Sequence, residues 1–132
     1  MTVFVDASAM VPLLDVANRD YAKVRAAWDQ FEQSDANLVT TNYVVVEALA
    51  VCQRRLGTAG ARGLLEDIVP GLIVEWVDPD AHDTAAVALL TTNRRDLSFV
   101  DITSFQIMRR LGITRAFALD DHFREQGFEV VP

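Results

Sequence analysis

Short segments typical of β-strands alternate along the chain with segments typical of helices, and this order limits the fold more than any other feature. Strands are predicted where β-branched and aromatic residues cluster, at residues 2–5, 37–40, 72–77, 115–119 and 128–131. Helix-forming sequence separates the first four of these segments. Such an order predicts an α/β fold with three layers, in which helices cover both faces of a mostly parallel central sheet.

The predicted helices carry start and end signals. Thr41 and Asp78 are residue types that cap a helix N-terminus, whereas Gly57 and Gly112 are of the type that often follows a helix end. Between these signals, apolar residues recur at helical spacing. We therefore expect helices that begin at Ala7 with Pro12 in the first turns, run from Asp20 to about Ser34, from Thr41 to Arg55, from Thr58 to just before Pro70, from Asp80 to Thr92, and from Phe99 to Leu111.

Length and composition indicate one globular domain over residues 1–132. A chain of 132 residues with 51% apolar residues can bury a hydrophobic core. Its apolar runs are far shorter than the ~20 residues that a membrane helix needs, so we expect no membrane contact. The start MTVFVD lacks the basic stretch of a signal peptide, and the single Cys52 cannot form an internal disulfide. A cytoplasmic location is expected.

The charge balance is acidic, with 19 acids against 12 bases and a net charge of −7. Nucleic-acid-binding proteins usually have a basic surplus, so this balance taken alone argues against RNA or DNA as a ligand. Apart from Lys23, however, every base is an arginine, and six of them form adjacent pairs, at 54 and 55, 94 and 95, and 109 and 110. These pairs are either solvated helix ends or contacts for phosphate groups.

Four acids lie within apolar segments, where an ionised carboxylate is costly to bury without a partner. Asp6 follows ValPheVal and Asp120 follows PheAlaLeu, each just past a predicted strand. Residues in such positions meet at one edge of a parallel sheet. Glu47 and Asp101 lie near the starts of predicted helices that can lean over the same edge. The sequence therefore predicts a cluster of four carboxylates.

Other acids have simpler explanations. Glu75 lies in a strand whose alternation can turn its side chain to solvent, and Asp78 is placed to cap a helix. Three further acids have polar neighbours and are expected at the surface: Asp15, Asp96 and Asp121.

Four clustered carboxylates repel one another unless a hard cation lies among them. Ligation by oxygen alone, without paired His or Cys ligands, favours Mg²⁺, with Mn²⁺ as the other candidate. Sites of this composition mostly carry out phosphoryl chemistry. The sequence offers no Ser-His-Asp or Cys-His set for a covalent mechanism.

Four stretches of the chain resemble the acidic motifs of the PIN-domain ribonucleases, and among these most closely the VapC-type toxins. They are VFVDASAM, TTNYVVVEAL, DLSFVDITSF and AFALDDHFREQGF, which follow one another in the family's order and spacing over nearly the whole chain. The last two are the most specific, because a strand-ending LDxHF followed by GF is a longer signature than a single aspartate.

The resemblance implies a set of roles. Asp6, Glu47, Asp101 and Asp120 match the family acids that bind Mg²⁺ and are catalytic. The implied reaction is hydrolysis of RNA phosphodiester bonds by metal-activated water, leaving a 5′-phosphate and a 3′-hydroxyl. The implied partners are an RNA substrate, a cognate antitoxin protein and a second copy of the chain in a homodimer.

Several neighbouring residues have less certain roles. Ser8 matches a family position that is usually Ser or Thr, where it either bonds a carboxylate or metal-bound water or simply caps a helix. Asn42 either holds the loop before Glu47 or touches substrate. We assign no role to His122, which reads as a polar turn residue, and we expect His82 at the surface.

Two other α/β families, response-regulator receivers and haloacid-dehalogenase-like phosphatases, also place an aspartate after the first strand. Both need a lysine late in the chain, and this sequence has none after Lys23. A further alternative is a PIN-like module that binds RNA or a protein partner without cleavage. The four retained acids argue against it, because unused buried acids only destabilise a fold. RNA cleavage that a chelator abolishes would distinguish a ribonuclease from a module that only binds. The sequence does not identify the RNA.

Overall fold

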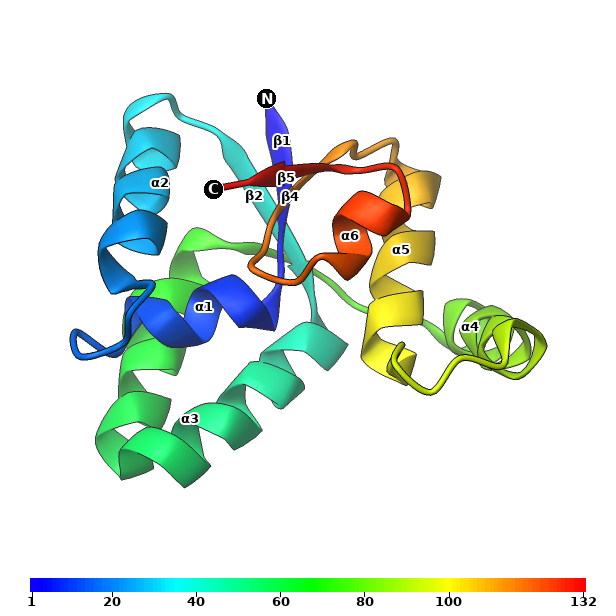
Figure 1. Cartoon of the computed structure of the whole chain (residues 1–132), viewed down its shortest axis with the longest axis horizontal. Helices are drawn as coiled ribbons and strands as arrows, with labels where there is room; N and C mark the ends of the chain where they lie inside the picture. The colour runs from blue at the N-terminus through cyan, green and yellow to red at the C-terminus, as the bar shows by residue number, and fades with distance from the viewer.

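A parallel sheet of five strands forms the centre of the computed structural model, which describes all residues from Met1 to Pro132 (Figure 1). The spatial order of the strands is β3-β2-β1-β4-β5, and every neighbouring pair is parallel. The predicted α/β class with a mostly parallel sheet is therefore confirmed. The strands are β1 (Thr2–Val5), β2 (Asn37–Thr41), β3 (Ile73–Glu75), β4 (Arg115–Phe117) and β5 (Glu129–Val131).

Helices cover both faces of this sheet, as the three-layer prediction requires. Figure 1 shows α1, α2 and α3 on one side and α4, α5 and α6 on the other. This division follows from the strand order, because right-handed crossovers that run outward from β1 in opposite directions place their helices on opposite faces. The helices are α1 (Ala7–Leu13), α2 (Tyr21–Gln33), α3 (Asn42–Gly63), α4 (Pro79–Thr92), α5 (Phe99–Leu111) and α6 (His122–Glu125), with a π-helical turn at Leu64–Ile68 and a 3₁₀ turn at Val69–Gly71.

The hydrophobic core packs against the two central strands. In β1, Val3, Phe4 and Val5 are fully buried. Phe4 contacts Phe123 of α6, and in β4 Phe117 contacts two aromatic rings of α2. The ends of β1 and β4, after which Asp6 and Asp120 follow, are therefore anchored on both faces. None of the helices has the length and apolar character needed to cross a bilayer.

One of two further segments agrees with the sequence expectation and the other differs from it. Gly57 has φ 70° and ψ −160°, which are not helical values, so the helix that begins at Asn42 is interrupted there, as predicted, and α3 consists of two helical stretches joined across a kink. The predicted strand at 115–119 ends at Phe117, because the backbone N–H of Leu119 donates to the hydroxyl of Ser8 instead of to a strand. The chain then turns into α6, a short helix that the sequence analysis did not predict.

Candidate active site

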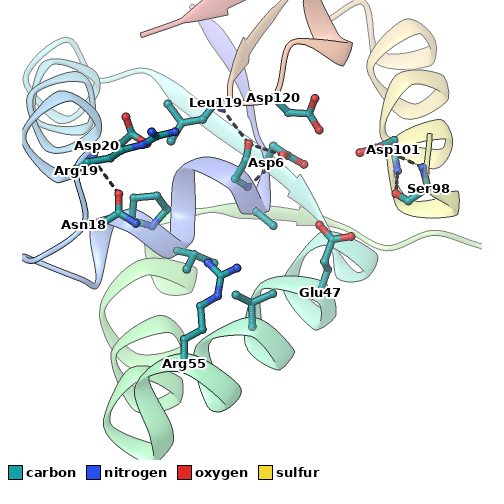
Figure 2. Close-up of a pocket in the computed structure, with 15 residues that line it drawn as sticks. Asp6, Asn18, Arg19, Asp20, Glu47, Arg55, Ser98, Asp101, Leu119 and Asp120 are labelled. Atoms are coloured by element: carbon teal, nitrogen blue, oxygen red, sulfur yellow. Dashed lines mark hydrogen bonds and ion pairs between the residues drawn. The ribbon is translucent and has the colours of Figure 1, made fainter. Parts of the chain in front are cut away.

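One pocket of about 590 Å³ lies at the edge of the sheet where β1 and β4 end (Figure 2). From β1 the chain continues to β2 and β3 on one side of the sheet, and it then crosses to β4 and β5 on the other side of β1. The strand order therefore reverses between β1 and β4, where the pocket lies. Open α/β sheets bind ligands at such points. All four predicted acids line the pocket: Asp6, Glu47, Asp101 and Asp120.

Asp6 is held in place from several sides. Its backbone N–H donates to the carbonyl of Phe117 in β4 at 3.0 Å. Its side chain caps α1, and Oδ2 accepts hydrogen bonds from the backbone N–H of Ser8 at 3.1 Å and from the Ser8 hydroxyl at 2.7 Å. The residue is only 3% exposed, and its other oxygen, Oδ1, is buried without any hydrogen-bond donor. A buried polar atom of this kind is open to a partner that the chain does not supply, such as a water molecule or a cation.

Ser8 joins the two halves of the site. Its hydroxyl donates to Asp6 and accepts the N–H of Leu119 at 2.9 Å, so it connects the start of α1 to the residue before Asp120. The sequence left open whether Ser8 bonds a carboxylate or only caps a helix. In the structure its hydroxyl bonds the carboxylate of Asp6.

Asp101 is positioned by a capping box at the start of α5. Its backbone N–H donates to the hydroxyl of Ser98 at 3.0 Å, and its Oδ2 accepts the N–H of Ser98 at 3.1 Å. The same pair of hydrogen bonds therefore starts α5 at Ser98 and fixes the side-chain orientation of Asp101. Glu47, in the second turn of α3, has no hydrogen-bond partner in the chain and extends toward the other acids (Figure 2).

Asp120 has a neighbour that the sequence analysis passed over. The backbone N–H of His122 donates to Asp120 Oδ1 at 2.9 Å, and the His122 ring nitrogen Nε2 lies 3.7 Å from the same oxygen. Single ligand atoms of Asp101, Asp120 and His122 lie within 4.8 Å of one another. The signal in the sequence was the position of His122, two residues after Asp120, but histidines are common in polar turns.

The clustered charges change the acidity of the site. Burial raises the pKa of Asp6 from 3.8 to about 6; the two bonds from Ser8 oppose this shift, and the charges of Asp101 and Asp120 add to it. Burial and the charges of the other three acids raise the pKa of Glu47 from 4.5 to about 7. Burial also raises the pKa of Asp101, against the bond from Ser98. The site is therefore short of positive charge at neutral pH.

These features fit a divalent cation. The unpartnered Oδ1 of Asp6, the raised carboxyl pKa values and the converging oxygens are what a cation would relieve. Hard divalent cations prefer carboxylate oxygens. The residues that could hold such an ion are Asp6, Glu47, Asp101 and Asp120, with His122 at the rim.

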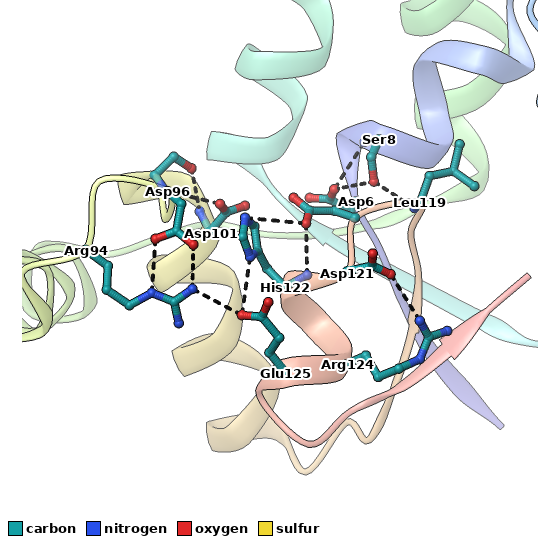
Figure 3. Close-up of polar contacts among 12 residues, drawn as sticks. Asp6, Ser8, Arg94, Asp96, Asp101, Leu119, Asp121, His122, Arg124 and Glu125 are labelled. Carbon is teal, nitrogen blue, oxygen red and sulfur yellow. Dashed lines mark hydrogen bonds and ion pairs between the residues drawn. The ribbon is translucent and has the colours of Figure 1, made fainter.

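A chain of ion pairs supports His122 from the outside (Figure 3). Arg94 bonds Asp96 through two nitrogens and also reaches Glu125 at 3.1 Å, while Glu125 lies 3.5 Å from His122 Nδ1. Desolvation lowers the pKa of His122, but Asp120 and Glu125 together outweigh it and raise the pKa. Asp96 is exposed, and Asp121 bonds only Arg124 with its side chain 87% exposed, so both lie at the surface as predicted.

The remaining candidates lie away from the carboxylates. Asn42 does not line the pocket, and its Oδ1 accepts the N–H of Val77 at 2.8 Å, which favours a structural role over contact with substrate. Asp78 caps α4 as expected. Glu75 pairs with Arg110 at 3.2 Å, and His82 is exposed beside Tyr43.

Comparison with known proteins gives matches over nearly the whole chain. The model of the PIN domain matches residues 3–129. The chain is 33% identical over 135 aligned positions to the 23S rRNA-specific endonuclease VapC20 of Mycobacterium tuberculosis, and the match covers 98% of both proteins.

Solved structures give the same result. The crystal structure of M. tuberculosis VapC20, described as a sarcin-ricin loop cleaving toxin, superposes with a TM-score of 0.86 at 31% identity and covers 98% of this chain and 99% of that one. FitAcB from Neisseria gonorrhoeae superposes with a TM-score of 0.69 at 14% identity, covers 100% of this chain and 97% of that one, and shares the fold.

Proposed function

The chain belongs to the PIN-domain family, and on that premise we propose that it is a metal-dependent endoribonuclease and the toxin of a toxin-antitoxin pair. The whole chain, residues 1–132, acts as one PIN domain in this proposal. One observation carries it: four carboxylates from four separate segments line a single pocket, and the most buried of them keeps an oxygen that no group in the chain satisfies.

In this proposal the four acids hold Mg²⁺, or Mn²⁺ in its place, because both prefer oxygen ligands. A bound divalent ion supplies an activated water and charge stabilisation for phosphodiester hydrolysis. Ser8 fixes one oxygen of Asp6, Ser98 fixes one oxygen of Asp101, and in each case the second oxygen is left for the ion. The chain thus contributes ligands already oriented by its own hydrogen bonds.

The proposed substrate is RNA, and the relative's description names where to look first. VapC20 is described as cleaving the sarcin-ricin loop of 23S rRNA. We propose the same loop as the first substrate to test for this chain. The proposed partner is a cognate antitoxin protein that covers the pocket, and the proposed location is the cytoplasm.

Asp101→Asn and Asp121→Asn provide a matched test. Asn keeps the volume at position 101, and its carbonyl oxygen can still accept the N–H of Ser98, so the cap of α5 remains. The loss of a ligand charge should lower RNA cleavage by about 100-fold or more. The exposed Asp121 makes only a surface ion pair, so Asp121→Asn should keep full activity.

The measurement is mapping of cleaved ends on 23S rRNA, with Mg²⁺ and with chelator. A 5′-phosphate at a discrete site that disappears with chelator supports the proposal. Binding of RNA without any cleavage would favour the module that only binds. For the toxin assignment, expression of the chain alone should arrest growth, and co-expression of the neighbouring reading frame should relieve the arrest.

A further inference from the structure

The pocket that holds the acids has a second, basic end. Arg55 of α3 lines it together with Asn18, Arg19 and Asp20 from the turn before α2, on the side away from Asp101 (Figure 2). Guanidinium groups are cations and cannot ligate a metal ion, so their presence in the same cavity points to an anionic ligand. The two arginines outnumber Asp20 at this end, so the pocket has an acidic part and a part with a net positive charge.

Helix α3 carries one charge of each sign along a single face. Glu47, Val51 and Arg55 are spaced by four residues, which places them on the same side of the helix, and all three line the pocket. Eight residues correspond to about 12 Å along a helix axis. Figure 2 shows the Arg55 side chain extending from α3 into the pocket, on the side of Glu47 that faces α1.

Arg55 has no partner of its own within the chain. Most of the arginines are used in ion pairs or hydrogen bonds, and those without one are Arg54, Arg55 and Arg95. Of these three, only Arg55 lines the pocket. In a chain with an acidic excess, an arginine without a carboxylate partner in a cavity is available to an anionic ligand.

The two neighbours of Arg55 in the pocket also offer donors. Asn18 Oδ1 accepts the backbone N–H of Asp20 at 2.8 Å, which leaves its amide NH₂ without a partner in the chain. Arg19 has a side chain 93% exposed, and its single ionic contact, with Asp20, is a loose 3.7 Å. Three separate donor groups thus surround the basic end.

We propose that Arg55, assisted by Asn18 and Arg19, binds a phosphate of the RNA strand other than the scissile one. This inference rests on the proposed ribonuclease function. It adds the path that the RNA strand takes from the four acids along the surface of the protein. The scissile phosphate lies at the four acids, and the strand continues along the face of α3 toward Arg55. An arginine fork can bond two oxygens of one phosphate, so the contact fixes the register of the strand as well as its affinity.

The test compares Arg55→Gln with Arg54→Gln. Both variants remove one charge from adjacent positions of the same helix, but Arg54 does not line the pocket. The probe is a synthetic RNA hairpin with the sequence of the 23S sarcin-ricin loop. Binding is measured by fluorescence anisotropy in chelator, and cleavage by single-turnover kinetics in Mg²⁺ across a range of protein concentrations.

Arg55→Gln should weaken binding about tenfold and reduce the slope of log affinity against log salt by roughly 0.7 to 1, as expected for one lost phosphate contact. In the kinetics it should raise the protein concentration for half-maximal rate and leave the maximal rate within about twofold. Arg54→Gln should match wild type in both assays. Thermal melting of each variant shows whether the fold is intact.

Hairpins with one uncharged methylphosphonate linkage at a time then locate the phosphate. One linkage near the scissile bond should weaken binding to wild type but cause no further loss with Arg55→Gln, which is the signature of a direct contact. Equal binding by Arg55→Gln and Arg54→Gln, or losses that add at every linkage, overturns the phosphate contact. Absence of cleavage by wild type in Mg²⁺ counts instead against the ribonuclease proposal. The binding assay is done in chelator and does not depend on cleavage.

Discussion

At the scale of single residues, Ser8 connects the two sides of the site, because its hydroxyl donates to Asp6 and accepts the N–H of Leu119. Ser8→Ala should destabilise the fold by about 1–2 kcal/mol, since it removes two partly buried hydrogen bonds. It should also lower RNA cleavage about tenfold or more, because Asp6 loses its orientation. Ser8→Thr keeps the hydroxyl and should restore most of the activity. Equal melting and cleavage by Ser8→Ala and wild type would contradict this role.

Glu47 gives the metal-free protein a pH dependence of stability. Its pKa is raised to about 7 in the folded state, so between about pH 4.5 and 7 the folded chain binds more protons than the unfolded chain. The free energy of unfolding therefore falls as the pH rises through this range. Asp6, with its pKa raised to about 6, acts in the same direction.

We expect the protein in chelator to melt at a higher temperature at pH 5 than at pH 7.5. Glu47→Gln should melt above wild type at pH 7.5 and should reduce this difference, because it removes a charge that burial and the other acids disfavour, without removing any hydrogen bond. Glu75→Gln is the control, since Glu75 pairs with Arg110 outside the pocket. Stability that is flat or rises from pH 5 to 7.5 in chelator would show that burial and the neighbouring acids do not raise the pKa values of Glu47 and Asp6.

The sequence identified the acids of the site better than their surroundings. Asp6, Glu47, Asp101 and Asp120 stood out because carboxylates in apolar segments need an explanation, and the structure brings all four to one pocket. Their oriented oxygens could not be foreseen, since the bond from Ser8 to Leu119 joins residues 111 positions apart. Arg55 was visible only as half of an arginine pair, because its position in the pocket depends on how α3 crosses the sheet edge.

At the scale of the elements, Gly57 controls the shape of α3. Its φ of 70° with ψ of −160° lies in a region that is accessible almost only to glycine. Gly57→Ala should therefore cost about 1–3 kcal/mol of stability, measured by chemical denaturation. The added methyl group meets no atom within 4 Å, so the loss would come from the backbone and not from a clash. Gln53→Ala, at an exposed helical position, should change stability by less than about 0.5 kcal/mol. Equal losses in both variants would contradict this explanation.

Helix and strand positions followed from local signals where a cap or a periodic face was present. Asp78 begins α4 and Gly112 ends α5 in a left-handed conformation, as predicted, whereas the capping role of Ser98 at the start of α5 was not predicted. Gly57 was predicted to end a helix, and its non-helical φ and ψ do interrupt α3 at that residue. Helix α6 was missed because four residues give no periodic pattern, and it forms only where Phe123 can enter the core.

At the scale of the whole molecule, metal binding should couple to folding. An ion that binds the folded pocket stabilises it by RT ln(1 + [Mg]/Kd), which is about 2.7 kcal/mol at a hundredfold excess over Kd. Mg²⁺ should therefore raise the melting temperature of the wild type and do much less for Asp101→Asn. Calorimetric scans with Mg²⁺ and with chelator measure both. An identical response of the two proteins would mean that Asp101 is not a ligand.

The assembly of the chain is a separate prediction. Large apolar side chains remain exposed on several elements, among them Val46, Trp76, Val87 and Leu90. Burial of part of this surface in a homodimer agrees with the family resemblance. Light scattering at micromolar concentration should give twice the mass of the chain, and a strictly monomeric mass contradicts the prediction.

The strand order also determines at which stage of protein synthesis the site can form. Strand β1 is made first, but its neighbour β4 is among the last segments to be made, and Asp6 depends on Phe117 for its backbone bond. During synthesis a growing chain therefore carries three of the four acids without a pocket to hold them together. It gains the pocket only after the segment around Asp120 has emerged and β4 has docked beside β1. If the chain is the proposed ribonuclease, its active site therefore forms only when synthesis is almost complete.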